Sequence, residues 1–352
     1  MSEQTASQTP PPPSQDSVAP GTETSPLKPK RRQFILPYLM LVVFFLTLLP
    51  GPLFFMGLLL PGPMKEAKTI VIPRGSSVHD ITEILDQNGV LIHPILFRAA
   101  SRLMAKDQLK AGEYLVPPGL SVLDVTDMLH DGRVVLRKLT VPEGLTSYEI
   151  TTLLLGTEAL DGDIPGIPAE GSLRPETYTY AYHDSRQDLL TRMQKEQKKL
   201  MEKEWAGRQE GLPLKTPQEA LILASIVEKE TGPKASERAL VASVFINRLR
   251  LRMPLQSDPT VIYALTDGTG SLGRKLTRAD LLVPSPLNTY LHPGIPPKPI
   301  SNPGQAALHA VLHPEETDFL YFVADGTGGH TFAKSLSEHN KNVSYWQSLR
   351  RP

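Results

Sequence analysis

The sequence predicts an α+β protein on a single N-terminal membrane helix, with a small α+β subdomain followed by a larger α+β domain. Residues 33–64 contain no charged side chain. Short strand-like runs then alternate with capped helical segments, and a continuously apolar helix lies in the middle of the remainder. The 352 residues exceed the ~100–200 of one domain, so we expect four segments: 1–32, 33–64, 65–140 and 141–352.

Composition limits the classes of function. Lysine plus arginine and aspartate plus glutamate number 37 each, so the formal net charge is zero. Nucleic-acid binding depends on many basic contacts to phosphates, so no nucleic-acid partner is expected. The absence of cysteine excludes disulfides, cysteine-type zinc sites, a thiol nucleophile and a lipidated cysteine anchor. Residues 1–32 are rich in Pro, Ser, Thr and Gln, and we expect them to form a disordered tail.

The uncharged segment 33–64 is longer than the ~20 apolar residues that cross a bilayer. Pro50 and Pro52 should kink or break its helix. Basic residues concentrate just before it, at Lys28, Lys30, Arg31 and Arg32, whereas only Lys65 and Lys68 follow closely. The positive-inside rule then places the N-terminus in the cytoplasm and the rest outside the inner membrane. A cleaved signal peptide is the alternative, but the tail is long for one and no A-x-A site is present.

The predicted small subdomain combines short strands with capped helices. Strands are expected at 69–72, 113–116 and 134–141, and helices at 78–85, 93–103 and 123–129. Two segments, Pro73 to Ser77 and Pro142 to Thr146, both lead from a strand through Pro-x-Gly into a helix cap, which is a weak internal repeat. This unit acts either as a passive spacer or as a binding module. Further helices are expected at 148–155 and 188–205.

One later helix carries the residues of greatest chemical interest. Thr216 is the expected N-cap, Pro217 fits the first helical position, and Glu219 completes a capping box. Residues 220–227 are apolar on every face, which predicts a helix buried in the domain centre. Gly232-Pro233 is expected to end it.

Glu228 and Glu230 lie in the last turn of this helix. The negative end of the helix dipole and the apolar surroundings both favour a protonated carboxyl group, as a general acid requires. Residues two apart lie roughly 200° apart around a helix, so one of the two at most faces a given cleft. The alternative is that both belong to a hydrated helix end.

Several separate blocks resemble the endolytic transglycosylase family, also called MltG or YceG-like. The blocks, in order, are Ala224 to Thr231, Val241 to Leu249, Leu255 to Tyr263, Asn288 to Tyr290, Gly294 to Pro297, Tyr321 to Gly326 and Gly329 to Phe332. The resemblance covers roughly residues 69–345. In the family's layout, the small N-terminal unit looks like a LysM-type module.

The resemblance implies lytic cleavage between N-acetylmuramic acid and N-acetylglucosamine in peptidoglycan strands, which leaves a 1,6-anhydro end. By motif match, the essential glutamate is Glu230, with Glu228 as second choice. Because the sugar's own C6 hydroxyl is the nucleophile, one carboxyl group serves as acid and then as base, without metal ion or cofactor. Peptidoglycan synthases are implied as partners. The block Glu170 to Tyr178 departs from the family, since Ser172 and Arg174 replace two aromatic residues.

Other polar residues are candidates for contact with sugar. Gln256 and Asp258 lie before Pro259, and they bind hydroxyl groups or cap the next helix. Asp258 is also a possible second carboxylate, which would favour a hydrolase. Asn288 and Tyr290 lie in a proline-rich segment expected to form a groove wall.

Histidines give weaker signals. His309 and His313 have the i, i+4 spacing that binds zinc, but no third ligand is evident and surface positions are expected, so no metal site is predicted. His330 and Thr331 follow the turn at Asp325-Gly326 and either line the cleft or pack. A non-enzymatic peptidoglycan-binding scaffold remains an alternative for the whole chain.

Overall fold

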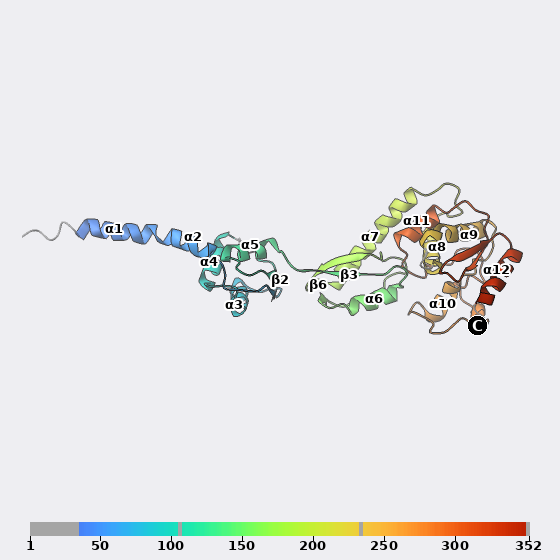
Figure 1. Cartoon of the computed structure of the whole chain (residues 1–352), viewed down its shortest axis with the longest axis horizontal. Helices are drawn as coiled ribbons and strands as arrows, with labels where there is room; N and C mark the ends of the chain where they lie inside the picture. Colours follow the sequence, from blue (N-terminus) through green and yellow to red (C-terminus); the bar gives the residue numbers. More distant parts are fainter. Residues whose placement is uncertain (1–34, 105–107, 232–234, 350–352) are drawn as a thin grey trace, which may run out of the picture. The chain divides into compact units, whose positions relative to one another are not determined.

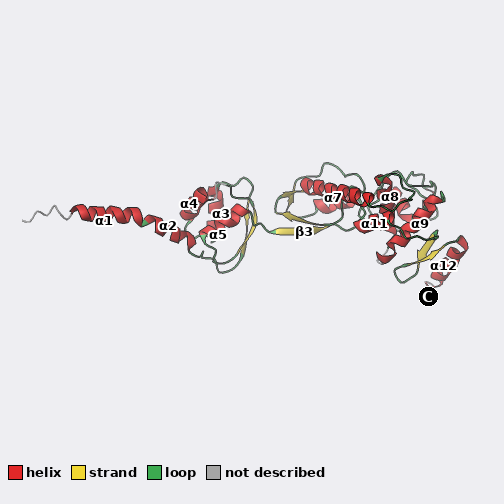
Figure 2. Cartoon of the chain, turned by 90° about the horizontal axis from the view of Figure 1, so that it is seen from above, coloured by secondary structure: helices red, strands yellow, loops and turns green. Residues whose placement is uncertain are grey.

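The computed structural model describes residues 35–104, 108–231 and 235–349, so the predicted tail at 1–32 lies outside the described residues. These residues form two compact units, one ending at Leu59 and one beginning at Leu60. Helices and short strands both occur in the second unit, which confirms the α+β class (Figure 2).

The first unit contains α1 (Ile35–Leu48) and α2 (Pro50–Leu59). The helix breaks at Leu49, as the two prolines predict, because proline has no N–H to donate to the preceding turn. Within the described residues, the segment Pro37–Leu59 is the one helical stretch long and apolar enough to cross a membrane. Its length of 23 residues exceeds the ~20 that a bilayer requires.

The N-terminal part of the second unit pairs two strands and packs three helices. Its elements are β1 (Lys68–Ile72), α3 (Val78–Gln87), α4 (Pro94–Met104), β2 (Gly112–Val116) and α5 (Val122–Asp131). The strands are antiparallel, with Lys68 opposite Val116 and Ile72 opposite Gly112. Phe97 and Tyr114 are almost fully buried. The expected strands at 69–72 and 113–116 and the three expected helices are therefore confirmed, whereas the strand expected at 134–141 pairs outside this part.

The Pro-x-Gly repeat has a third copy. Ser77, Ser121 and Thr146 each cap a helix with a complete capping box, in which the cap hydroxyl and a carboxylate three residues later bond each other's backbone N–H groups. The glycine two residues before each cap has a positive φ, between 72° and 82°. Glycine adopts this conformation without the steric penalty of a Cβ, which explains the recurrence of the motif.

The middle of the unit joins strands that are distant in the sequence. Its elements are β3 (Leu136–Thr140), α6 (Ser147–Leu155), β4 (Leu160–Asp161), β5 (Thr177–Ala181), β6 (Asp184–Ser185) and α7 (Arg186–Ala206). Strand β3 pairs antiparallel with β5, and β4 pairs parallel with β6. Ile150, Leu173 and Met193 are fully buried in the core beneath them.

The C-terminal part surrounds α8. Its elements are α8 (Pro217–Glu230), the 3-10 helix η1 (Ala235–Glu237), α9 (Arg238–Arg250), α10 (Asp258–Thr266), the 3-10 helix η2 (Asp280–Leu282), α11 (Gln305–Leu312), β7 (Tyr321–Ala324), β8 (His330–Ala333) and α12 (Leu336–Leu349). Helix α8 packs against α7, α9 and α11 (Figure 1). Strands β7 and β8 form an antiparallel hairpin around the expected turn at Asp325-Gly326. This packing makes α8 the centre of the larger core.

Candidate functional site

Helix α8 is buried along most of its length, and its last residue is Glu230. The Thr216 hydroxyl accepts the N–H of Glu219 at 3.2 Å, as predicted for the N-cap. The reciprocal bond differs from the predicted capping box, because the Glu219 carboxylate accepts the N–H of Lys215 instead of that of Thr216. Every residue from 220 to 227 is buried, which confirms the central position. The helix ends at Glu230; Gly232 and Pro233 lie outside the described residues.

Glu228 makes structural contacts. One carboxylate oxygen lies 3.2 Å from Arg238 Nη2, and the other accepts the N–H of Gly304 at 2.8 Å. Gly304 is the N-cap of α11, so the carboxylate also lies at the positive end of a helix dipole. Burial raises the pKa of Glu228, while the Gly304 N–H and Arg238 act in the opposite direction. The side chain is only 5% exposed, so Glu228 is not placed to bind substrate.

Glu230 leaves the helix in another direction and is partly exposed. Its Oε1 accepts the Ser257 hydroxyl at 2.6 Å. Ser257 is itself fixed, because its N–H donates to Thr289 Oγ1 at 2.9 Å and that hydroxyl also contacts Thr260 Oγ1. A buried chain of hydroxyl groups therefore sets the position of one Glu230 oxygen.

The surroundings of Glu230 favour its protonated form. Burial among protein atoms is the largest influence and raises the pKa of Glu230 to about 7. The Ser257 hydrogen bond lowers this pKa, the charge of Asp258 raises it, and the charge of Arg248 lowers it. A carboxyl group with a pKa near neutral pH holds and releases a proton under ordinary conditions, which suits general acid–base catalysis.

One pocket at Glu230, of about 380 Å³, brings together predicted residues. Gln256, Asp258 and Tyr290 line it together with Glu230. Asp258 is the first residue of α10, and its Oδ1 accepts the Tyr290 hydroxyl at 2.6 Å instead of capping the helix. Gln256 has a φ of 52°, in the left-handed region that non-glycine residues seldom adopt. Such backbone conformations are more frequent at functional sites.

Arg248 also lines this pocket, and its guanidinium group is held by backbone carbonyl groups. Its guanidinium donates to the carbonyl groups of Leu320 and Leu255, both at 2.7 Å. The Tyr321 ring lies 5.2 Å from the guanidinium carbon. Because Arg248 is only 7% exposed and bonded to the backbone, it supplies a fixed positive charge near Glu230.

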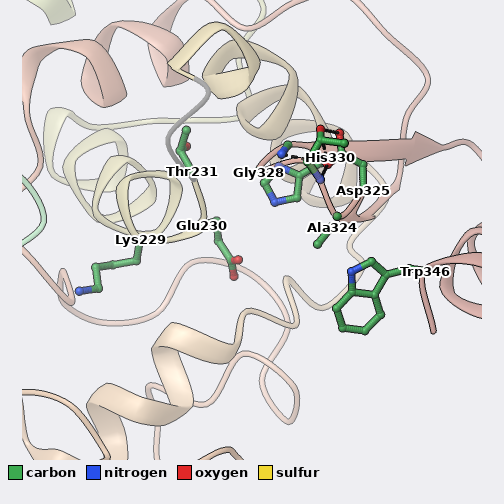
Figure 3. A pocket seen from close by; sticks show the side chains of 11 residues that line it. Lys229, Glu230, Thr231, Ala324, Asp325, Gly328, His330 and Trp346 are labelled. Carbon is green, nitrogen blue, oxygen red and sulfur yellow. Dashed lines mark hydrogen bonds between the residues drawn. The ribbon is translucent and has the colours of Figure 1, made fainter. Parts of the chain in front are cut away.

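A second pocket, of about 560 Å³, also has Glu230 in its wall. It is lined by Thr231, by the hairpin turn 324–330 and by Trp346 of α12. Figure 3 shows that Glu230 and Lys229 leave α8 on different sides, and that Ala324 and Trp346 lie on the side of Glu230. Glu230 therefore lies where two hollows meet.

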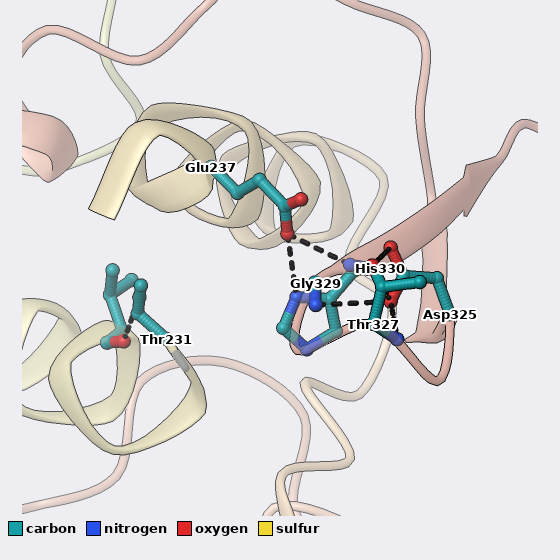
Figure 4. Close-up of polar contacts among 7 residues, drawn as sticks. Thr231, Glu237, Asp325, Thr327, Gly329 and His330 are labelled. Atoms are coloured by element: carbon teal, nitrogen blue, oxygen red, sulfur yellow. Dashed lines mark hydrogen bonds and ion pairs between the residues drawn. The ribbon is translucent and has the colours of Figure 1, made fainter. Parts of the chain in front are cut away.

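Side chains hold the turn of this second pocket in place (Figure 4). Asp325 Oδ1 accepts the N–H groups of Thr327 and Gly329 at 2.7 and 3.0 Å. Glu237 Oε2 accepts the N–H of His330 at 2.8 Å and lies 3.0 Å from its Nδ1. His330 thus both lines the pocket and fixes the hairpin to η1, which combines the two predicted alternatives.

The structure corrects the prediction for Asn288. This side chain is fully buried, its Nδ2 donates to the carbonyl groups of Leu281 and Val283, and its Oδ1 accepts the N–H of Tyr290. All of these bonds shape the loop that carries Tyr290. Asn288 therefore positions the pocket wall and has no surface left for a sugar.

The altered block 170–178 is part of the scaffold. Glu170 is held by the Ser147 N–H at 2.8 Å and by the Tyr263 hydroxyl at 2.8 Å. Ser172 lies in a pocket with Gln197 and Leu221 that shares no lining residue with the two pockets at Glu230. The loss of an aromatic ring at residue 172 therefore changes a region outside these two pockets.

Sequence reasoning missed several residues of the site. They are Ser257, Thr289, Arg248, Tyr321, His339 and Trp346. Ser257 and Arg248 lie inside the blocks that carry the family resemblance, but local patterns do not show which side chain a distant loop directs at Glu230. Only the tertiary contact identifies them.

Comparison with known proteins identifies the family of this chain. The sequence model of the YceG-like family matches residues 70–345. The chain belongs to the YceG-like family. This confirms the resemblance read from the sequence.

Relatives from the same family share about a third of their residues with this chain. An endolytic murein transglycosylase of Bacillus subtilis (strain 168) is 33% identical over 330 residues, which cover 84% of this chain and 90% of the relative. One of Streptococcus pneumoniae serotype 2 is 30% identical and covers 80% of this chain, which spans 58% of that longer relative. A solved YceG-like protein of Listeria monocytogenes has 32% identity, covers 79% of this chain and 99% of its own, and gives a TM-score of 0.48.

Proposed function

We propose that this chain is an endolytic lytic transglycosylase that cleaves nascent murein strands between N-acetylmuramic acid and N-acetylglucosamine, and so limits strand length. One observation carries the proposal: the carboxyl group of Glu230, with a pKa raised to about 7, lies in the wall of two adjoining pockets. A polymer that runs through both pockets would pass Glu230 within its length. This supports cleavage inside a strand rather than at its end.

Glu230 acts first as the general acid. It donates its proton to the glycosidic oxygen as the bond to C1 of N-acetylmuramic acid breaks, and positive charge develops at that carbon. The resulting carboxylate is stabilised by the Ser257 hydroxyl and by the fixed charge of Arg248. It then removes the proton of the C6 hydroxyl, whose oxygen attacks C1. The products are a new hydroxyl end and a 1,6-anhydro end, and Glu230 regains its proton.

A hydrolase acting on the same bond is the second candidate. Asp258 lines the same pocket as Glu230, and its charge influences the pKa of Glu230. A second carboxylate is what a glycoside hydrolase uses to activate water or to form a covalent intermediate. The hydrogen bond from Tyr290 occupies one oxygen of Asp258, which favours a role in holding the pocket.

Product analysis distinguishes these reactions. The full chain in detergent is incubated with purified murein, and the released fragments are separated and weighed by mass spectrometry. Anhydro ends are expected; reducing ends would identify a hydrolase, and no release at all would identify a binding scaffold. Glu230→Gln should abolish release, while Glu219→Gln at the other end of α8 serves as the control. Release that persists in Glu230→Gln would show that the catalytic assignment is wrong.

Membrane attachment and partners extend the proposal. The helical stretch Pro37–Leu59 anchors the chain with its N-terminus in the cytoplasm, so the second unit meets murein near the inner membrane. The unit at 65–140 serves as a LysM-like module for glycan strands, and peptidoglycan synthases supply the strands that are cut. A protease added to intact spheroplasts tests the orientation, because it should digest residues after 65 and spare an N-terminal tag.

A further inference from the structure

Three potential metal ligands come together among residues that line neither of the two pockets at Glu230. Glu204 comes from the last turns of α7, His309 from α11, and His313 caps the end of α11. One ligand atom from each lies within 4.8 Å of the other two. The spacing of the histidines alone offered no third ligand, and the packing of α7 against α11 supplies it.

Glu204 is unusual because it is a buried acid. It is only 7% exposed, and buried carboxylates are normally paired or bound to a metal ion. Its Oε2 lies 3.0 Å from His309 Nδ1, and its Oε1 accepts the Gln305 side-chain amide at 3.1 Å. Both oxygens therefore have fixed directions, and one of them points at an imidazole nitrogen.

His313 is oriented as metal-bound histidines usually are. Its Nε2 lies 2.8 Å from the carbonyl oxygen of Gly207, and in the neutral tautomer that donates this N–H the Nδ1 atom carries a lone pair. Metal-ligating histidines commonly donate their second ring N–H to a backbone carbonyl in this way. The Nδ1 atom lies 3.3 Å from the carbonyl oxygen of His309, and in the same tautomer it has no proton to donate to that oxygen. The rings of His309 and His313 stack with centroids 4.2 Å apart, so both can turn toward one point.

We propose that Glu204, His309 and His313 bind a zinc ion that joins the end of α7 to α11. Nitrogen and carboxylate ligands suit Zn²⁺, which forms bonds of about 2.0–2.2 Å. His309 Nδ1 and Glu204 Oε2 lie 3.0 Å apart, so a zinc ion bonded to both would make an N–Zn–O angle of about 90–100°. The His313 ring is half-buried at the surface and closes the site by a side-chain rotation. Water completes the coordination.

The ion would act on the fold and not on the reaction. Helix α11 packs directly against α8, the helix that ends at Glu230. A zinc ion across α7 and α11 therefore stabilises the scaffold behind the cleft. The site is independent of the proposed reaction, so each can fail without the other.

Direct metal binding tests the proposal. The full chain in detergent is treated with a chelator, and ZnCl₂ is added in a calorimeter. One Zn²⁺ per chain is expected, and excess zinc should raise the Tm by about 5 °C, since a ligand at 100 times its Kd stabilises the native state appreciably. Cobalt, which replaces zinc, should give visible absorption bands of a low-coordinate site.

Single substitutions separate this site from incidental binding. His309→Ala and His313→Ala remove exposed or half-buried side chains and should weaken zinc binding at least tenfold. His183→Ala is the matched control, because His183 also contacts a carboxylate, Asp161, at 2.7 Å but belongs to no such cluster among the described residues. Absence of zinc binding in the unaltered chain, or equal binding in the His309→Ala and His313→Ala variants, would overturn the proposal.

Discussion

The hydrogen bond from Ser257 to Glu230 allows a quantitative test of the catalytic assignment. The donor and acceptor oxygens are 2.6 Å apart, and Ser257 is almost fully buried. A hydrogen bond to a charged group is worth about 1.5–3 kcal/mol, against about 0.5–1.5 kcal/mol for a neutral pair. The hydroxyl thus favours the carboxylate over the carboxylic acid by on the order of 1–1.5 kcal/mol, or about one pKa unit.

Ser257→Ala should therefore raise the pKa of Glu230 from about 7 by about one further unit. A general acid works while it is protonated, so activity is lost as pH rises through this pKa. The alkaline limb of the kcat/KM profile should move upward by the same amount. At pH 8 the protonated fraction would grow from about 10% to about 50%. The maximal rate should fall, because the carboxylate loses the donor that orients it.

The assay follows the release of anhydro-ended fragments between pH 5 and pH 10. Ser243→Ala is the matched control: Ser243 is also almost fully buried and bonded to a hydroxyl, that of Thr317 at 2.9 Å, yet it lies outside the two pockets at Glu230. This variant should leave the alkaline limb in place. If Ser257→Ala leaves the limb unchanged or lowers it, Glu230 is not the group whose proton limits the reaction.

Three further predictions concern the neighbouring carboxyl groups. Asp258→Asn removes a charge that raises the pKa of Glu230, so the alkaline limb should move to lower pH, opposite to the effect of Ser257→Ala; complete loss of activity would favour the hydrolase. Glu230→Gln should stabilise the fold above pH 7, because the free energy of unfolding of the unaltered chain falls as pH rises from 4.5, the usual pKa, to about 7, the pKa of Glu230 in the fold. The gain should be at most about 3 kcal/mol and should vanish below pH 4.5, where the carboxyl group is protonated in both states. Denaturant titrations above pH 7 and below pH 4.5 would measure it. Glu228→Gln removes the nearer of the two carboxylates beside the half-buried Arg238, since Glu143 lies 3.9 Å away, and should reduce the free energy of unfolding by about 1–3 kcal/mol, while the folded variant keeps the pH profile of the unaltered chain.

The sequence by itself determined the local elements and the identity of the central helix. Thr216 with Pro217 starts α8, and the run from 220 to 227, apolar except for Ser225, is buried as expected, because capping and hydrophobic patterning depend on residues within a few positions of each other. The angle between successive residues also separated Glu228 from Glu230 before any contact was known. The break near Pro50 followed from the missing N–H of proline in the same way.

Only the tertiary structure decided which side chains surround these carboxyl groups. Ser257 lies 27 positions from Glu230 in the sequence. The Glu228 carboxylate is bound by Arg238 of α9 and by the N–H of Gly304 at the start of α11. Asn288, expected in a groove wall with its amide available, proves to be fully occupied by the backbone of its own loop. Local patterns carry no record of these partners, since pairing across long sequence distances depends on how complete elements pack. For the same reason, the sequence did not reveal Glu204 as the third ligand beside His309 and His313, because Glu204 lies on α7, more than a hundred residues from His309.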